Sequence, residues 1–258
     1  MPLNPTLAQG IDIYSGNGAY TPRKPVDFVI AKSSEGTALD TRFDQNYDTC
    51  AKAGIPFFAY HYMRTSVAWR YQADVMLGAI AGKKVSMLFW DYETKHNVLN
   101  PKSAADAVSA MSYLRQMTGK PVGLYADRQR TADIYRDAPA SRDFPLYFAQ
   151  YYISKKEWDN TPNIEPKYTP QFKQQVPWFI WQYASELNFL GHDAGHEYGV
   201  ESHSIDINVC KFSKEELVGY LSLFSGNSNI FNATPDPQLS LQEQIDDLDR
   251  RVKKLEGR

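Results

Sequence analysis

Eight short segments rich in aromatic and β-branched residues recur along the chain, and they limit the fold more than any other feature. Segments with helical periodicity, at about 44–53, 69–82, 101–118 and 127–137, separate several of them. Strands that alternate with helices are typical of a mostly parallel sheet. Eight of them predict a barrel closed on itself, with an active site at the carboxyl ends of the strands. The predicted strands are Gly10–Ile13, Phe28–Ser33, Phe57–Tyr62, Ser86–Asp91, Val122–Tyr125, Leu146–Gln150, Phe179–Gln182 and Ser204–Val209.

The helix predicted over 101–118 has the clearest boundaries. Asn100 can cap its first turn, and Gly119 ends it. A capping box, Ser213-Lys-Glu-Glu216, predicts one more helix after the last strand. The later strands are joined by less helical segments, such as 151–178. We therefore expect an α/β fold that is an irregular TIM-like (β/α) barrel with eight strands and fewer than eight helices.

The composition changes after residue 224. Gly, Asn, Pro and Ser crowd residues 225–238, which predicts a linker between a barrel domain over 1–224 and a short C-terminal helix over 239–258. That helix has a heptad seam, with β-branched residues at a and Leu at d, which favours a parallel homo-oligomer. A single amphipathic helix packed on its own domain fits the same pattern. The seam consists of Leu241, Ile245, Leu248, Val252 and Leu255.

Charge and hydropathy exclude several classes of protein. The 258 residues carry 28 Lys and Arg against 30 Asp and Glu, a net charge of −2, which argues against nucleic-acid partners. The longest apolar runs are too short for membrane insertion. The first residues have no basic start or apolar core, so we expect synthesis in a cytoplasm without a signal peptide. We predict that the two cysteines, Cys50 and Cys210, are separate buried thiols.

The residues best suited to chemistry lie in the segment Leu88-Phe-Trp-Asp91-Tyr-Glu93. Because side chains alternate along a strand, Asp91 and Glu93 share one face and emerge at the mouth of the barrel. Two carboxyl groups crowded together push their pKa values apart, so that one stays protonated while the other stays charged. Cleavage of a glycosidic bond needs this combination.

Two further acids lie in the first and last predicted strands. Asp12 closes Gly10–Ile13, and Asp206 lies in Ser204–Val209. Since the first and last strands of a closed barrel are neighbours, both acids can join Asp91 and Glu93 around one mouth. Four acids at strand ends point to an enzyme that acts on sugars, although each one alone fits a salt bridge or a strand-end cap.

At this point the chain resembles glycoside hydrolase family 25, the Chalaropsis-type lysozymes, which include many phage endolysins. The resemblance covers about residues 8–212, with two departures: Tyr14 stands where Ser is common, and Leu146-Tyr-Phe-Ala149 replaces a usual Leu-Trp-Ile-Ala. The matching segments are Gly10-Ile-Asp-Ile-Tyr-Ser-Gly-Asn-Gly18, Phe28-Val-Ile-Ala-Lys-Ser-Ser-Glu-Gly36, Ala53-Gly-Ile, Ala59-Tyr-His-Tyr62, Gln72-Ala, Trp90-Asp-Tyr-Glu93, Val122-Gly-Leu-Tyr125, Trp181-Gln-Tyr183 and Ile205-Asp-Ile-Asn208.

The resemblance implies a lysozyme, an N-acetylmuramidase that cleaves the β-1,4 bond between N-acetylmuramic acid and N-acetylglucosamine in bacterial peptidoglycan. It implies that Glu93 is the general acid and later the base. It implies that Asp91 orients and stabilises the substrate's N-acetyl group, although a direct nucleophilic role for Asp91 stays open. It implies that Asp206 and Asp12 are supporting carboxylates that tune charge and position. A phage endolysin that reaches the cell wall after release and lyses its host is the role we expect. The alternatives are an inactive, multivalent glycan-binding module and a glycosidase for chitin-like polymers.

Aromatic residues near the strand ends are candidate sugar platforms, because an apolar sugar face can stack on a ring. The candidates are Tyr62, Tyr125, Trp181 and Tyr183, and a core position fits each of them about as well. Trp90 and Tyr92 alternate away from the acids and are expected in the core, and His61 is expected to be a hydrogen-bonded inward residue. We expect no cofactor and no metal, since the spacing of His192, His196 and His203 does not match a zinc site.

Overall fold

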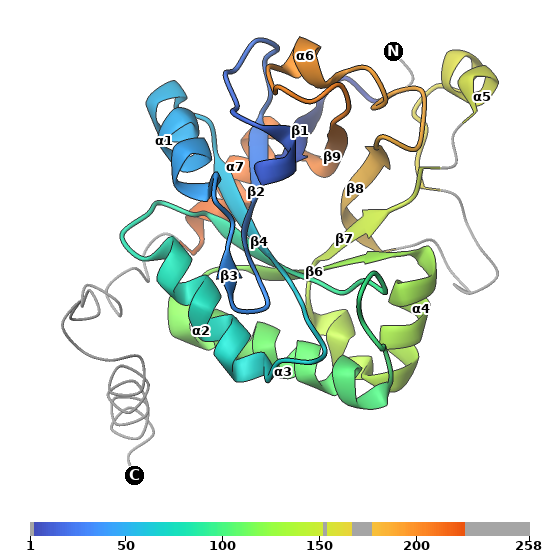
Figure 1. Ribbon diagram of the computed structural model, residues 1–258. Coiled ribbons are helices and arrows are strands. Elements are labelled where there is room, and N and C mark those ends of the chain that lie inside the picture. Colours follow the sequence, from blue (N-terminus) through green and yellow to red (C-terminus); the bar gives the residue numbers. More distant parts are fainter. Residues whose placement is uncertain (1–2, 152–153, 167–176, 225–258) are drawn as a thin grey trace.

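The computed structural model describes residues 3–151, 154–166 and 177–224 (Figure 1). In chain order, the elements are β1 (Leu7–Ile13), η1 (Ser15–Asn17), β2 (Phe28–Glu35), β3 (Ala38–Leu39), α1 (Phe43–Ala53), β4 (Phe57–Tyr62), α2 (Trp69–Ile80), β5 (Met87–Asp91), α3 (Pro101–Thr118), β6 (Val122–Asp127), α4 (Arg128–Asp137), η2 (Pro139–Asp143), β7 (Leu146–Ala149), α5 (Lys155–Asn160), β8 (Trp178–Ala184), α6 (Gly195–Tyr198), β9 (Asp206–Ser213) and α7 (Lys214–Ser222).

Eight strands close into a barrel, as predicted. The sheet runs in the order β1-β9-β8-β7-β6-β5-β4-β2-β3, and an additional pairing of β1 with β2 closes the ring. The two-residue strand β3, which the sequence did not indicate, pairs only with β2 and lies outside the ring. The described residues contain seven α-helices, so the expectation of fewer helices than strands is confirmed.

The last strand departs from the parallel arrangement. Strands β1, β2 and β4 to β8 run parallel to one another, whereas β9 is antiparallel to both of its neighbours, β8 and β1. A parallel return needs a connection that crosses to the other end of the sheet, usually through a helix. The segment between β8 and β9 contains only the four-residue helix α6. Strand β9 therefore starts, rather than ends, at the mouth.

The helices that follow the early strands are well formed. Asn100 accepts a hydrogen bond from the Ser103 backbone N–H at 2.9 Å, Pro101 occupies the first turn, and Gly119 ends α3 with a φ of 64°. Helices α2, α3 and α4 lie along one side of the barrel (Figure 1). In the second half, α5 has only six residues, so the barrel is irregular where we expected it to be.

Two apolar clusters lie on opposite faces of the sheet. The outer cluster joins strand residues such as Leu88 and Trp90 to residues of α2 and α3. The inner cluster fills the barrel with the alternate residues, including Phe28, Phe58 and Phe89, and Leu217 of α7 packs against it. The barrel is therefore closed by side chains at the end opposite the mouth, which we call the floor.

Two predictions concern residues outside the described ranges. The linker over 225–238 and the heptad helix over 239–258 both lie there, so they stay predictions.

Cys50 and Cys210 are buried free thiols, as predicted. None of the helices in the described ranges combines the length and apolarity that crossing a membrane requires.

Candidate active site

The structure brings the four predicted acids together at the mouth. Asp12, near the end of β1, is directly opposite Asp206, the first residue of β9. Asp91 is the last residue of β5, and Glu93 follows it by two residues. The negative charges of Glu93 and Asp12 both act on Asp91, and those of Asp12 and Glu93 act on Asp206. The four carboxyl groups thus form one electrostatic unit.

Burial dominates the chemistry of Asp91 and Asp206. Asp91 is 5% exposed, and its Oδ1 has no hydrogen-bond partner among the described residues. Burial, followed by the charge of Glu93, raises the pKa of Asp91 well above its ordinary value, and the Lys32 ammonium partly offsets the rise. Burial and the charge of Asp12 likewise raise the pKa of Asp206. Carboxyl groups with pKa values raised this far by burial are typical of functional sites.

Glu93 has the properties of a proton donor. Burial raises its pKa, while a hydrogen bond with Tyr125 opposes the rise and the charges of Asp127 and Asp12 add to it. Its side chain is partly accessible at the mouth. A carboxyl group that keeps its proton to higher pH and still reaches solvent can serve as a general acid.

Asp12 is held by three donors rather than left free. Its Oδ2 lies 2.7 Å from the Tyr147 hydroxyl, 2.8 Å from the Gln182 Nε2 and 3.0 Å from the Asn208 Nδ2. Burial raises its pKa, and these hydrogen bonds lower it. Asp12 is therefore anchored in one orientation, unlike Asp91, whose buried Oδ1 has no hydrogen-bond partner among the described residues.

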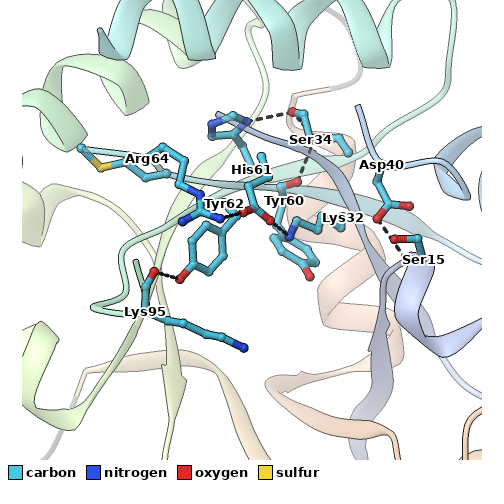
Figure 2. A network of polar contacts seen from close by, with 12 residues as sticks. Ser15, Lys32, Ser34, Asp40, Tyr60, His61, Tyr62, Arg64 and Lys95 are labelled. Atoms are coloured by element: carbon cyan, nitrogen blue, oxygen red, sulfur yellow. Dashed lines mark hydrogen bonds and ion pairs between the residues drawn. The ribbon is translucent and has the colours of Figure 1, made fainter. Parts of the chain in front are cut away.

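A ring of tyrosines surrounds the acids. The Tyr62 hydroxyl donates to the Lys95 carbonyl at 2.6 Å, and the Lys32 ammonium lies 4.9 Å from the centre of the Tyr62 ring (Figure 2). The Tyr125 hydroxyl lies 2.8 Å from Gln182 Oε1, and its ring packs edge-on against Tyr147 at 4.7 Å. Both predicted sugar platforms on this face, Tyr62 and Tyr125, thus border the acids with their hydroxyls fixed.

A pocket of about 410 Å³ opens at the rim of the mouth. Its lining comes from the segments that follow β1, β2 and β4, and it includes Lys32, which also acts on Asp91. Glu35 forms ion pairs with both Lys32 and Arg64, and Asp40 accepts a hydrogen bond from the Ser15 backbone N–H (Figure 2). The pocket therefore offers donors and acceptors held in place next to the acids.

Two of the predicted platforms do not border the mouth. Trp181 is 1% exposed and Tyr183 4%, and both belong to the outer cluster. The Trp181 indole N–H donates to the Gln150 carbonyl at 3.1 Å, and Tyr183 stacks on Trp158. Strand alternation explains the correction, because residues 181 and 183 point outward when 180 and 182 point inward. Trp90 and Tyr92 are core residues, as predicted.

His61 is a buried, hydrogen-bonded residue, as expected, but it lies on the outward face of the sheet against Trp90 and α2, so the expectation of an inward position is wrong. It is fully buried, its Nδ1 lies 2.8 Å from Ser34 Oγ, and its Nε2 lies 3.1 Å from Gln72 Oε1. Its ring stacks on Trp90, and burial lowers its pKa to about 4, so the imidazole is neutral at pH 7. Within the described ranges, no three or more His, Cys, Asp or Glu side chains gather in an arrangement that suits a metal ion.

Several residues of the site were not predicted as site residues. Gln182, Tyr147 and Asn208 contact Asp12. The Lys32 ammonium lies over the Tyr62 ring, and its charge acts on Asp91. The alternation of side chains along a strand is the sequence signal that could have identified Gln182 and Asn208. In β8 it assigns Gln182 to the inner face with Ile180, and in β9 it assigns Asn208 to the face of Asp206.

The chain is similar to known proteins over most of its length. A family model described as glycosyl hydrolases family 25 matches residues 11–192. An autolytic lysozyme of Clostridium acetobutylicum is 28% identical over 219 residues, which cover 82% of this chain and 57% of that protein. This chain thus spans less than two thirds of the length of that relative.

Solved structures share the fold. A family 25 glycosyl hydrolase from Bacillus anthracis superposes with a TM-score of 0.64 at 20% identity, covering 84% of this chain and 94% of that one. The catalytic domain of the endolysin ply40, from bacteriophage P40 of Listeria monocytogenes, has a TM-score of 0.61 at 21% identity, covering 84% and 98%. Since the family model covers more than half of the residues and the fold agrees, the chain belongs to glycosyl hydrolase family 25.

Proposed function

We propose that the protein is a lysozyme, an N-acetylmuramidase that hydrolyses the β-1,4 bond between N-acetylmuramic acid and N-acetylglucosamine in bacterial peptidoglycan. The observation that carries the proposal is the pair at the end of β5. Glu93 is an accessible carboxyl group with a raised pKa, and Asp91 beside it has a buried oxygen without a partner among the described residues. Membership of the family and the similarity to an autolytic lysozyme support the same activity.

In the first step, Glu93 donates its proton to the glycosidic oxygen as the bond to the anomeric carbon breaks. Asp91 Oδ1 accepts the N–H of the substrate's N-acetyl group and turns the acetyl oxygen toward the anomeric carbon. That oxygen forms the new bond, so positive charge develops on the acetamido group beside a carboxylate that stabilises it. Direct attack by Asp91 on the anomeric carbon is the alternative step, and it would give a covalent intermediate.

In the second step, Glu93 accepts a proton from water while the water oxygen attacks the anomeric carbon and the acetyl oxygen leaves. Asp12 and Asp206 act as supporting groups. The negative charge of Asp12 raises the pKa of Glu93 and of Asp206, and the charges of both supporting acids favour a positively charged transition state. Activity therefore falls on the alkaline side as Glu93 loses its proton, at a higher pH than for an exposed glutamate.

We assign the substrate groove to the mouth and the rim pocket. The hydroxyls of Tyr62 and Tyr125 are held by hydrogen bonds, and Lys32, whose ammonium lies over the Tyr62 ring, also lines the rim pocket. Sugar hydroxyls pair well with the alternating donors and acceptors of Lys32, Glu35 and Asp40. Trp181 and Tyr183 are not part of this groove, because they lie in the outer cluster.

Mass analysis of peptidoglycan digests, before and after borohydride reduction, tests the function. Cleavage by a muramidase leaves reduced N-acetylmuramic acid at the new ends, and the Glu93→Gln variant provides the inactive control. New ends of reduced N-acetylglucosamine would contradict the assignment of the bond. Products from chitin oligomers but not from peptidoglycan would favour the chitin-like alternative, and tight binding without any product would favour a binding module.

A phage endolysin that lyses its host is the finer proposal. The fold shared with an endolysin catalytic domain supports it, together with the resemblance to a family that includes many endolysins. The test is expression inside bacteria with and without a membrane-permeabilising protein. Lysis that requires permeabilisation fits an enzyme released through membrane holes, and lysis without it contradicts that route.

A further inference from the structure

The rim pocket has charges of both signs in its lining. Glu35 forms ion pairs with both Lys32 and Arg64, so these three side chains together carry one positive charge in excess. Asp40 accepts a hydrogen bond from the Ser15 backbone N–H at 2.9 Å, a neutral donor that leaves the negative charge of the carboxylate in place (Figure 2). Sugar hydroxyls supply hydrogen bonds to such groups but bring no charge of their own. A ligand with both a carboxylate and an ammonium group matches the pocket better.

A strand edge forms another part of the lining. Strand β3 (Ala38–Leu39) pairs only with β2 among the described strands, so its other edge has no strand partner there. Unpaired strand edges present backbone N–H and C=O groups, which the amides of a peptide can bind. Leu39 is 60% exposed and places an apolar side chain beside these polar groups. Amide-binding, charged and apolar groups in one pocket are typical of a site for a peptide.

The pocket is joined to the acids through Lys32. The Lys32 ammonium lies 4.9 Å from the centre of the Tyr62 ring, and Tyr62 pairs with Asp91 in the register of β4 and β5. The Arg64 guanidinium lies 5.4 Å from the centre of the same ring. In the proposed reaction, Asp91 binds the N-acetyl group of N-acetylmuramic acid. The neighbouring ring carbon of that sugar carries the lactyl group to which the peptide of peptidoglycan is attached, so this peptide starts within one sugar ring of Asp91.

We propose that the rim pocket binds the peptide attached to the N-acetylmuramic acid at the cleaved bond. The inference rests on the proposed function, because it uses the sugar position that Asp91 fixes. A carboxylate of the peptide binds near Lys32 and Arg64, and its free amino group binds near Asp40. Small side chains of the peptide pack on Leu39. The enzyme therefore selects glycan strands that carry peptides over strands that have lost them.

The first test compares two forms of one substrate. Glycan strands from peptidoglycan are used either intact or after an amidase has removed their peptides, and both forms keep the same β-1,4 bonds. We expect kcat/KM of the wild-type protein to be about 10-fold higher on strands with peptides, the effect of one charge-assisted hydrogen bond. Equal values of kcat/KM on the two forms would overturn the inference.

Two variants test whether the preference comes from the pocket. Arg64→Met removes a positive charge, and Ala38→Phe adds a ring to the lining from an exposed position on β3. In each variant, the ratio of the two kcat/KM values should fall toward one. The matched control is Arg115→Met, which also removes an arginine from above an aromatic ring, Phe144 at 4.6 Å, but on α3 and outside the pocket. It should keep the wild-type ratio. A wild-type ratio in either pocket variant would overturn the inference.

A binding measurement without turnover separates this inference from the proposed function. The probe is the free peptide that the amidase releases, added to the full chain with ¹⁵N-labelled backbone amides. We expect NMR shift changes at residues 36–41 and at Arg64, and none on α3. If the wild-type protein cuts neither form of the strands, the proposed function fails, and the titration with the peptide still decides the inference. Unchanged shifts around the pocket at about 10 mM peptide would overturn it.

Discussion

The floor and the mouth of the barrel are built from the same strands and the same face of the sheet, yet they differ completely in chemistry. On β5, Phe89 belongs to the floor and Asp91 to the mouth, two residues further on. On β8, Ile180 belongs to the inner cluster, and Gln182 joins the acids. On each of these strands, two residues along the chain separate an apolar side chain that stabilises the fold from a polar side chain of the site.

The difference is also energetic. At the floor, Phe28 stacks on Phe58 with ring centres 5.4 Å apart, and burial of such rings stabilises the barrel. At the mouth, burial raises the pKa values of Asp91 and Asp206, which means that their charged forms destabilise the folded state. The floor therefore holds together a mouth that is unfavourable by itself.

The largest expected effect is a loss of activity caused by a substitution at the mouth. Glu93→Gln removes the proton donor, and we expect kcat on peptidoglycan to fall by about 10²- to 10⁴-fold. The thermal midpoint should not fall below that of wild type, because burial raises the pKa of Glu93 and the neutral amide removes that cost. Glu215→Gln, an exposed position on α7, is the control with full activity. A fully active Glu93→Gln variant would remove Glu93 from its role.

The largest expected effect on stability belongs to the floor. Phe89→Ala removes a fully buried ring that packs on Phe58 and covers the bare backbone of Gly123. We expect a loss of about 3–5 kcal/mol in the free energy of unfolding, measured by urea denaturation. Phe89→Leu should lose much less. If Phe89→Ala abolished activity in a protein of unchanged stability, the division between floor and mouth would not hold.

Asp91→Asn should gain stability while losing activity. Because the folded pKa of Asp91 is raised, its contribution to stability is present below its ordinary pKa of about 4 and is lost as the pH rises through the raised value. Asp91→Asn should therefore be more stable than wild type by about 1–3 kcal/mol at pH 7, and by almost nothing near pH 3. Denaturant melts at both pH values measure this. Equal stability differences at the two pH values would show that burial of the charge is not the cause.

The smallest expected effect is a change in KM caused by a substitution at the rim of the mouth. Tyr14 is 45% exposed, lies within the electrostatic reach of Asp206 and Asp40, and has the Lys32 ammonium 5.9 Å from its ring centre. If it adds a sugar contact, Tyr14→Ser should raise KM for glycan strands by about 2- to 10-fold, with kcat unchanged. Tyr14→Phe should keep the wild-type KM. A rise in KM in both variants would point to the hydroxyl rather than the ring.

Most of the fold could be predicted because its signals are local. All eight barrel strands and the caps of α3 and α7 follow from periodicity and turn residues in the sequence. The direction of β9 could not be predicted, since it depends on whether the segment after β8 crosses the barrel. The two-residue strand β3 and the short helix α6 depend on neighbours that are distant along the chain.

The acids of the site could be predicted because their positions at strand ends are also a local signal. Their hydrogen-bond partners, such as Gln182, could not be predicted in this way. Asp12, Asp91 and Asp206 lie at strand ends, a position that closure of the barrel turns into a shared mouth. Gln182 and Trp181 are adjacent in the sequence and point to opposite faces of the sheet. Which of the two points inward depends on the register of β8 against β7 and β9, and bulges shift that register on both sides.

The direction of β9 also has a practical consequence for engineering. A strand that enters at the mouth must leave at the floor, where Leu217 of α7 packs against the inner cluster. Any cargo fused after residue 224 would accordingly begin on the side of the molecule remote from the substrate. A fluorescent reporter attached there would leave the mouth and its acids uncovered.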